Sequence, residues 1–218
     1  MTTDDAGLSG ALDAIRKLYA GQNIRTVRLG FGRRAAVLVV DFQHLYTRGR
    51  ASTGLEAVEN TARLLDAARA AGMPVYFTVV AYAPDDDVLW TKKLPGLLDN
   101  AVDSEAASVD PLLAPRPGEW VIEKKAASAF LHTGLPERLK AEGVDTLLVC
   151  GTSTSGCVRA SVVEGMGHDI RMIVVRDCVS DRSALLHEVA MFDMGSKYAD
   201  LMSLDEVLAA IAERRAAA

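Results

Sequence analysis

The chain has 218 residues, of which 50% are hydrophobic, and its formal net charge is −5. This length allows one large domain with a sizeable core, and the negative charge argues against binding to nucleic acid or to an anionic membrane. The acidic segment MTTDDAGLSG lacks the features of a secretory signal, and no apolar run approaches the roughly 18 residues that span a bilayer. The three cysteines show neither a disulfide framework nor zinc-site spacing, so we predict a cytoplasmic protein.

The first 29 residues precede the first predicted strand and are predicted to be a helical extension. Within them, GLSGALDAIRKLYAGQN (7–23) has the character of a helix that could pack on a neighbouring subunit. Residues 30–218 contain no internal repeat and no linker rich in Pro, Gly or Ser. They are therefore predicted to form one domain.

Strands and helices alternate along that domain. Helical patterns are present in 54–74, in 135–145, in a segment beginning near Cys157, and in 203–215, which opens with a capping box from Ser203 to Glu206. The stretch 84–117 is predicted to be a long surface excursion. The alternation predicts a parallel sheet covered by helices on both faces. Five apolar runs rich in β-branched residues are the predicted strands: 35–41, 74–82, 119–124, 145–151 and 170–178.

Three chemically capable residues stand at the carboxyl ends of predicted strands, where ligands bind in open parallel sheets. Asp41 ends VLVVD, Lys124 ends WVIEK, and Cys157 follows LLVCG in the small-residue turn GTSTSGCV. A helix N-terminus and a nearby ammonium both lower the pKa of a thiol, and a carboxylate within reach can accept its proton. This arrangement predicts nucleophilic catalysis by Cys157.

Each of these residues also has a structural interpretation. Asp41 could only cap a turn, and Lys124 could be a solvated lysine, as could its neighbour Lys125. Cys150 and Cys178 lie inside apolar runs and are predicted to be small buried hydrophobic residues.

Two other functions remain open. A thiol-redox protein would use Cys157 but would need a resolving cysteine, for which Cys150 is poorly placed. A nucleotide-binding module could use GTSTSG as a phosphate cradle, although this loop lacks the G-x-G-x-x-G and P-loop patterns.

The segments AAVLVVDFQHLYT, VIEKKAASAF and LLVCGTSTSGCVRASVVEGMGHDIRMIVVRDCVSDR resemble the isochorismatase-like cysteine hydrolases. The resemblance runs from about Gly30 to Leu208 and implies a three-layer αβα sandwich around a six-stranded, mostly parallel sheet. It also implies a homo-oligomer, with a tetramer as the expected state.

The same resemblance assigns roles to single residues. The nucleophile is Cys157, the acid/base is Asp41, and the lysine is Lys124, because the family lysine stands four residues before the serine of SAF. The N–H groups of Ser153 and Cys157 would form the oxyanion hole. A cis peptide bond is implied between Thr152 and Ser153.

Within the family, the chain is most similar to the N-carbamoylsarcosine amidases and the maleamate amidohydrolases. This similarity implies an amidohydrolase that releases ammonia from a small carboxylate-bearing amide or ureide. Arg182 would hold the substrate carboxylate, unless it merely pairs with Asp181 on the surface, and Thr152 and Phe42 would contact the substrate. The stretch TVVAYAPDDDVLW lacks the histidines of metal-dependent members, so we predict an enzyme with no metal and no other cofactor.

Overall fold

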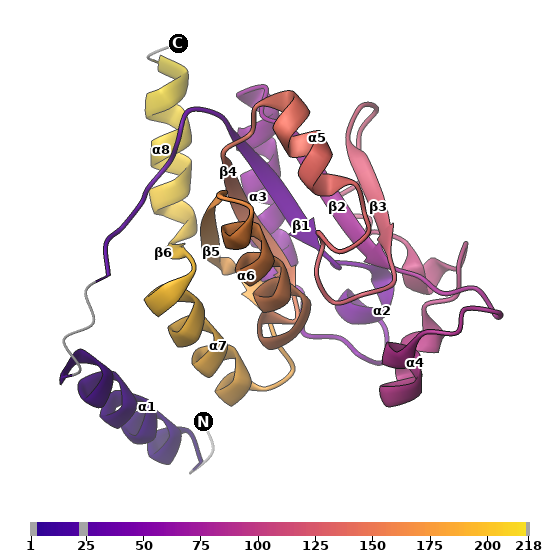
Figure 1. The fold of residues 1–218 in the computed structure, drawn as a ribbon, viewed down its shortest axis with the longest axis horizontal. Coiled ribbons are helices and arrows are strands. Elements are labelled where there is room, and N and C mark those ends of the chain that lie inside the picture. Colours follow the sequence, from indigo (N-terminus) through magenta and orange to yellow (C-terminus); the bar gives the residue numbers. More distant parts are fainter. Residues whose placement is uncertain (1–3, 22–25, 217–218) are drawn as a thin grey trace.

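The computed structural model describes residues 4–21 and 26–216, which fold around a six-stranded sheet (Figure 1). The strand order is β3-β2-β1-β4-β5-β6, and every neighbouring pair is parallel. The predicted α/β class is confirmed, and so are the five strands predicted from apolar runs. The sixth strand is only three residues long. The strands are β1 Ala35–Val40, β2 Val75–Val80, β3 Trp120–Lys124, β4 Thr146–Thr152, β5 Arg171–Ser180 and β6 Asp200–Met202.

Helices cover both faces of the sheet, which gives three layers (Figure 1). On one face, α3 (Glu56–Ala70) and α8 (Leu204–Ala216) bury Leu64 and Val207 against the sheet. On the other face lie α5 (Leu135–Glu142), α6 (Arg159–Gly167) and α7 (Ala184–Lys197). Both faces of the sheet are therefore buried, and this explains why its strands are apolar without alternation.

The predicted helix boundaries have identifiable causes. In α8 the Ser203 hydroxyl accepts a hydrogen bond from the Glu206 N–H at 3.2 Å. The Glu206 carboxylate accepts one from the Ser203 N–H at 2.7 Å, so the predicted capping box is present. Helix α5 ends at Gly143, whose φ of +68° favours glycine.

The N-terminal helix α1 (Asp4–Gly21) packs against α7 of the same chain (Figure 1). The rings of Tyr19 and Phe192 meet edge to face with 5.3 Å between their centroids. The contact of this helix with a neighbouring subunit and the boundary at residue 29 both stay predictions. None of the described helices has the length and apolar character needed to cross a membrane.

The excursion between β2 and β3 is folded into short helical turns. These turns are α4 (Leu89–Lys93) and two 3₁₀ helices, Pro95–Asp99 and Glu105–Ala107. A further short helix, α2 (His44–Thr47), follows β1. The segment with α2 follows the carboxyl end of β1, and the excursion follows the carboxyl end of β2. Both therefore lie at the edge of the sheet where the predicted site residues stand.

The strands β1 and β4 approach each other closely where Gly151 stands. Its φ is +127°, and a Cβ atom there would lie 2.0 Å from the carbonyl oxygen of Val40. No larger residue fits this contact without displacing the backbone. The absence of a side chain therefore allows the last residues of β1 and β4 to lie this close together.

Candidate active site

The predicted nucleophile and acid/base lie on either side of the topological switch point of the sheet. From β1 the chain proceeds to β2 and β3 in one direction, whereas β4, β5 and β6 proceed in the other. Asp41 directly follows β1, and Cys157 lies in a turn, Thr154–Val158, between β4 and α6. Open α/β sheets bind ligands in the crevice at such a point.

Asp41 and Lys124 form a buried ion pair. Lys124 Nζ lies 2.8 Å from Asp41 Oδ2, and the two side chains are 0% and 1% exposed. Lys124 also donates a hydrogen bond to the carbonyl oxygen of Ala126 at 2.9 Å, and its ammonium lies 5.7 Å from the centre of the Trp90 ring. Lys124 starts on β3, about 10 Å from β1 at the usual strand spacing. Only a long side chain can cover that distance.

The neighbouring Lys125 is directed elsewhere. Its Nζ atom lies 2.6 Å from both Asp86 Oδ2 and the carbonyl oxygen of Ala81, and 38% of its side chain is exposed. The structure therefore places Lys124, and not Lys125, against Asp41.

Thr78 donates a hydrogen bond to one oxygen of the Asp41 carboxylate. This residue lies on β2 between the strands that carry Asp41 and Lys124, and its Oγ1 atom donates to Asp41 Oδ1 at 2.7 Å. The Asp41 N–H donates in turn to the Thr78 carbonyl oxygen at 3.1 Å. Within the described part of the chain, Asp41 Oδ2 accepts no hydrogen bond of good geometry, although it lies against Lys124. That oxygen keeps the capacity to accept a proton.

The Cys157 thiol has a higher pKa than the sequence suggests. Burial and the negative charge of Asp41 raise the pKa of Cys157 to about 12, and the opposing effect of Lys124 is smaller. The ammonium lowers this pKa as expected, but the loss of solvent and the carboxylate outweigh it, so the expected net lowering is wrong. At neutral pH the sulfur is protonated, and Asp41 is the group beside it that can accept the proton.

The pKa of Lys124 responds to the same neighbours. Burial alone lowers it, but the negative charges of Asp41 and Cys157 have the larger combined effect, so the pKa of Lys124 is raised. The ammonium is thus charged beside the Asp41 carboxylate.

A cavity of about 830 Å³ opens above these residues. Asp41 and Cys157 line it, together with Thr152 and Ser153, whose peptide bond is cis. The Thr152 hydroxyl donates to the Ser180 carbonyl oxygen at 3.2 Å, which fixes its side chain at the end of β4. This volume suits a small organic substrate.

Phe42 was expected at the substrate, and the structure contradicts this. Its side chain is 1% exposed and packs with Val39 and Leu65 in the core beneath α3. Asp41 has a left-handed backbone (φ +52°), which interrupts the alternation of the strand, so Phe42 packs on the same face as Val39 and does not line the cavity.

Arg182 lies at the rim of the cavity, at the start of α7. Its side chain is exposed, and the described residues provide it with no ion pair, whereas Asp181 accepts hydrogen bonds from the N–H and the hydroxyl of Ser155 at 2.8 and 2.7 Å. The alternative of an Asp181–Arg182 pair is thereby wrong.

Several cavity residues come from segments that sequence reasoning did not connect with the site. Tyr46 and Arg50 come from the region of α2, and Arg50 pairs with Asp99 of the excursion. Burial raises the pKa of Tyr46 to about 12, so its hydroxyl stays protonated, and it accepts a hydrogen bond from Asn100 at 2.9 Å. Trp90 adds an aromatic wall. No local pattern marks these residues, because their position depends on how the excursion folds.

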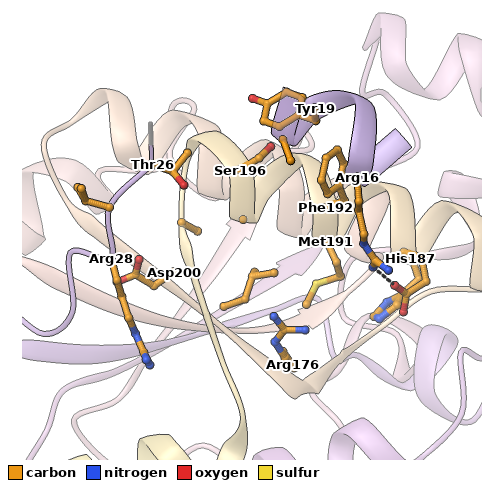
Figure 2. Close-up of a pocket in the computed structure, with 16 residues that line it drawn as sticks. Arg16, Tyr19, Thr26, Arg28, Arg176, His187, Met191, Phe192, Ser196 and Asp200 are labelled. Carbon is orange, nitrogen blue, oxygen red and sulfur yellow. Dashed lines mark hydrogen bonds and ion pairs between the residues drawn. The ribbon is translucent and has the colours of Figure 1, made fainter. Parts of the chain in front are cut away.

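A second cavity, of about 770 Å³, lies between α1 and α7 (Figure 2). Arginines line it, but Arg16 pairs with Glu188 and Arg28 pairs with Glu206. The described residues that line it include no cysteine, and the ion pairs neutralise much of its charge. The cavity above Cys157 is therefore the candidate active site.

The described residues provide no metal-binding cluster. No group of three or more His, Cys, Asp and Glu side chains within residues 4–21 and 26–216 is arranged to hold a metal ion. Two of the histidines have other contacts: His187 Nδ1 lies 2.9 Å from the Thr154 hydroxyl, and His44 lies 3.6 Å from Glu105.

Comparisons with known proteins agree with this architecture. The isochorismatase domain family matches residues 35–206. Maleamate amidohydrolase from Pseudomonas putida is 41% identical over 194 residues, which cover 86% of this chain and 91% of that protein. N-carbamoylsarcosine amidase from Arthrobacter sp is 34% identical over 214 residues, covering 93% of this chain and 80% of that protein.

Solved structures show the same fold. N-carbamoylsarcosine amidase from Thermoplasma acidophilum has a TM-score of 0.70 at 26% identity, covering 79% of this chain and 98% of that one. A cysteine hydrolase from Pseudomonas syringae has a TM-score of 0.82 at 23% identity, covering 88% and 99%.

The fold and these similarities define an enzyme of the hydrolase class with a parallel α/β sheet. The chain belongs to the isochorismatase family. The predictions of the family and of a hydrolase are confirmed.

Proposed function

We propose that the protein is a metal-independent amidohydrolase that releases ammonia from a small amide or ureide bearing a carboxylate. The observation that carries this proposal is the buried Asp41–Lys124 pair beside the Cys157 thiol at the floor of a cavity. The proposal uses Cys157 as nucleophile, Asp41 as acid/base and Lys124 as the fixed positive charge.

The first half of the reaction forms a thioester. Asp41 accepts the proton of Cys157 while the sulfur attacks the carbonyl carbon, so the carbon–sulfur bond forms and negative charge moves to the carbonyl oxygen. The N–H groups of Ser153 and Cys157 stabilise this oxyanion. When the intermediate collapses, the carbon–nitrogen bond breaks, and Asp41 returns its proton to the nitrogen, which leaves as ammonia.

The second half consumes water. Asp41 takes a proton from a water molecule that attacks the thioester, and the carbon–sulfur bond then breaks. The proton on Asp41 passes to the departing sulfur, which restores the thiol. Lys124 lies next to the carboxylate throughout, so the negative charge always has a positive partner.

Two relatives favour different substrates within this class. The resemblance to N-carbamoylsarcosine amidases favours a ureide, and the 41% identity with a maleamate amidohydrolase favours an unsaturated half-amide as the second candidate. Both offer a primary amide carbon near a carboxylate. Ammonia release from a panel of N-carbamoyl amino acids, dicarboxylic half-amides and neutral amides tests the proposal. Turnover of neutral amides alone would contradict the carboxylate requirement.

A redox function has less support. It would require a resolving cysteine near Cys157, and both Cys150 and Cys178 are 0% exposed within the core on one face of the sheet. Cys157 packs against the cluster on the opposite face.

Arg182→Lys should lower kcat/KM for the carboxylate substrate by roughly ten- to a hundredfold. A planar guanidinium can form two parallel hydrogen bonds to a carboxylate, and an ammonium cannot reproduce them. One charge-assisted hydrogen bond is worth on the order of 1.5–3 kcal/mol, which gives this range. The measurement is kcat/KM for the substrate and for its methyl ester. Equal losses on the two would show that Arg182 supports the structure and not the carboxylate.

Exhaustive treatment with a chelator should leave the activity unchanged, because Cys157 supplies the nucleophile and Asp41 supplies the base. The check is the rate of ammonia release before and after chelation, with the metal content of the sample measured in parallel. Loss of activity that a divalent ion restores would contradict a metal-independent mechanism.

A further inference from the structure

We propose that Thr78 is a positioning residue that directs Oδ2 of the Asp41 carboxylate, the oxygen beside Lys124, toward the proton of Cys157. The inference rests on the proposed function, because it assigns Asp41 the task of accepting that proton. It concerns a side chain on β2, which carries none of the three reacting groups.

Thr78 contacts Asp41 at both its side chain and its backbone. The hydroxyl donates to Asp41 Oδ1 at 2.7 Å, and the Asp41 N–H lies 3.3 Å from Thr78 Oγ1 and 3.1 Å from the Thr78 carbonyl oxygen. Thr78 is 1% exposed, so water cannot replace its hydroxyl. These contacts form because parallel pairing places Thr78 opposite Val40, the residue before Asp41.

The backbone of Asp41 has a conformation that is uncommon for a residue other than glycine, although Asp adopts it more readily than most. Its φ is +52°, in the left-handed region that residues with a side chain rarely adopt. The residue needs contacts on more than one side to remain there. Thr78 supplies them from β2, while Lys124 contacts the other oxygen from β3.

The two carboxylate oxygens therefore have different roles. Oδ1 accepts the Thr78 hydrogen bond, whereas Oδ2 lies against Lys124 and has no other hydrogen-bond donor among the described residues. A carboxylate free to rotate could exchange these oxygens. With Oδ1 fixed, Oδ2 is the atom that remains to accept the proton of the sulfur.

The hydroxyl also affects the charge of the site, because a hydrogen bond donated to an ionised carboxylate favours the ionised form. Removing this donor disfavours that form, so activity that needs the carboxylate should be lost at a higher pH as the solution is acidified. A residue with only a packing role would change stability without moving the pH profile.

The test compares Thr78→Val, which keeps the shape and removes the hydroxyl, with Thr78→Ser, which keeps the hydroxyl. Thr61→Val is the matched control, because Thr61 is a fully buried threonine of α3 whose hydroxyl donates to the Ala57 carbonyl oxygen. We expect Thr78→Val to lower kcat by about ten- to a hundredfold with little change in KM. The acid limb of its pH profile should move to higher pH, because the ionised carboxylate loses a hydrogen-bond donor. Thr78→Ser and Thr61→Val should retain the profile of the unaltered enzyme.

A second readout needs no substrate. The rate at which iodoacetamide alkylates Cys157 is measured against pH by mass spectrometry, and Thr78→Val should shift the acid limb of this profile in the same direction. If no amide is hydrolysed but the alkylation profile shifts, the proposed function fails and the role of Thr78 stands. An unshifted alkylation profile in folded Thr78→Val, or a shifted one in Thr78→Ser, would overturn the inference. If Thr78→Val does not fold, Thr78→Ala is measured in its place. Thr78→Ser must in either case keep the alkylation profile of the unaltered protein.

Discussion

Cys157→Ala should reduce kcat/KM by on the order of 10⁴- to 10⁶-fold while the fold stays intact. In the proposed mechanism the thiol makes the covalent bond to the substrate, and removing a nucleophile from a cooperating set of residues eliminates nearly the whole chemical step. Alanine suits the half-buried position of Cys157 in the turn before α6, so thermal unfolding should change little. The measurement is ammonia release together with a melting curve. Turnover within tenfold of the original would exclude Cys157 as nucleophile.

Labelling gives an independent check of the same residue. Iodoacetamide should modify Cys157 well before Cys150 or Cys178, because Cys157 lines the cavity and the other two are 0% exposed. Equal labelling of all three cysteines would contradict the assignment.

Lys124→Met should lower the free energy of unfolding by about 3–5 kcal/mol and abolish turnover. Methionine fills a similar volume but leaves the Asp41 carboxylate buried without a positive partner, and removing one member of a buried pair carries a penalty of this size. The double variant Asp41→Asn/Lys124→Met should recover much of the stability, since it removes both charges, but none of the activity. Urea denaturation measures the stability that Lys124→Met loses and the stability that the double variant recovers.

Lys125→Met is the matched control for this experiment. It removes the adjacent lysine, whose pair with Asp86 is partly exposed to solvent, so its cost should be below about 1 kcal/mol. Similar losses for Lys124→Met and Lys125→Met would show that burial of the Asp41–Lys124 pair does not govern the stability.

The sequence predicted much of the fold because its signals are local. Apolar runs located β1 to β5, and the Ser203–Glu206 pair located the start of α8. β6 has only three residues, too few to show a pattern. Helix α7 is apolar on more than one side, because it contacts the sheet, α1 and the active-site cavity, so its sequence lacks one clear apolar face.

The site could be predicted as far as the ends of the strands. Asp41, Lys124 and Cys157 follow strands that can be recognised from sequence, and the sheet brings them to one edge. The pKa of Cys157 was predicted in the wrong direction because burial depends on the whole fold. Tyr46 and Trp90 were not foreseen, since they reach the cavity from connecting segments.

The segment between β2 and β3 allows the substrate preference of this enzyme to evolve separately from its chemical step. The proposed reacting groups lie on or directly after strands of the sheet and in the turn that follows β4, whereas Trp90, Leu94 and Asp99 form part of the cavity wall from the segment between β2 and β3. Mutations, insertions and deletions in such a segment are tolerated more readily than changes in a core strand. A lineage with this fold can therefore acquire a new substrate by remodelling one surface segment, while its chemical step is inherited unchanged.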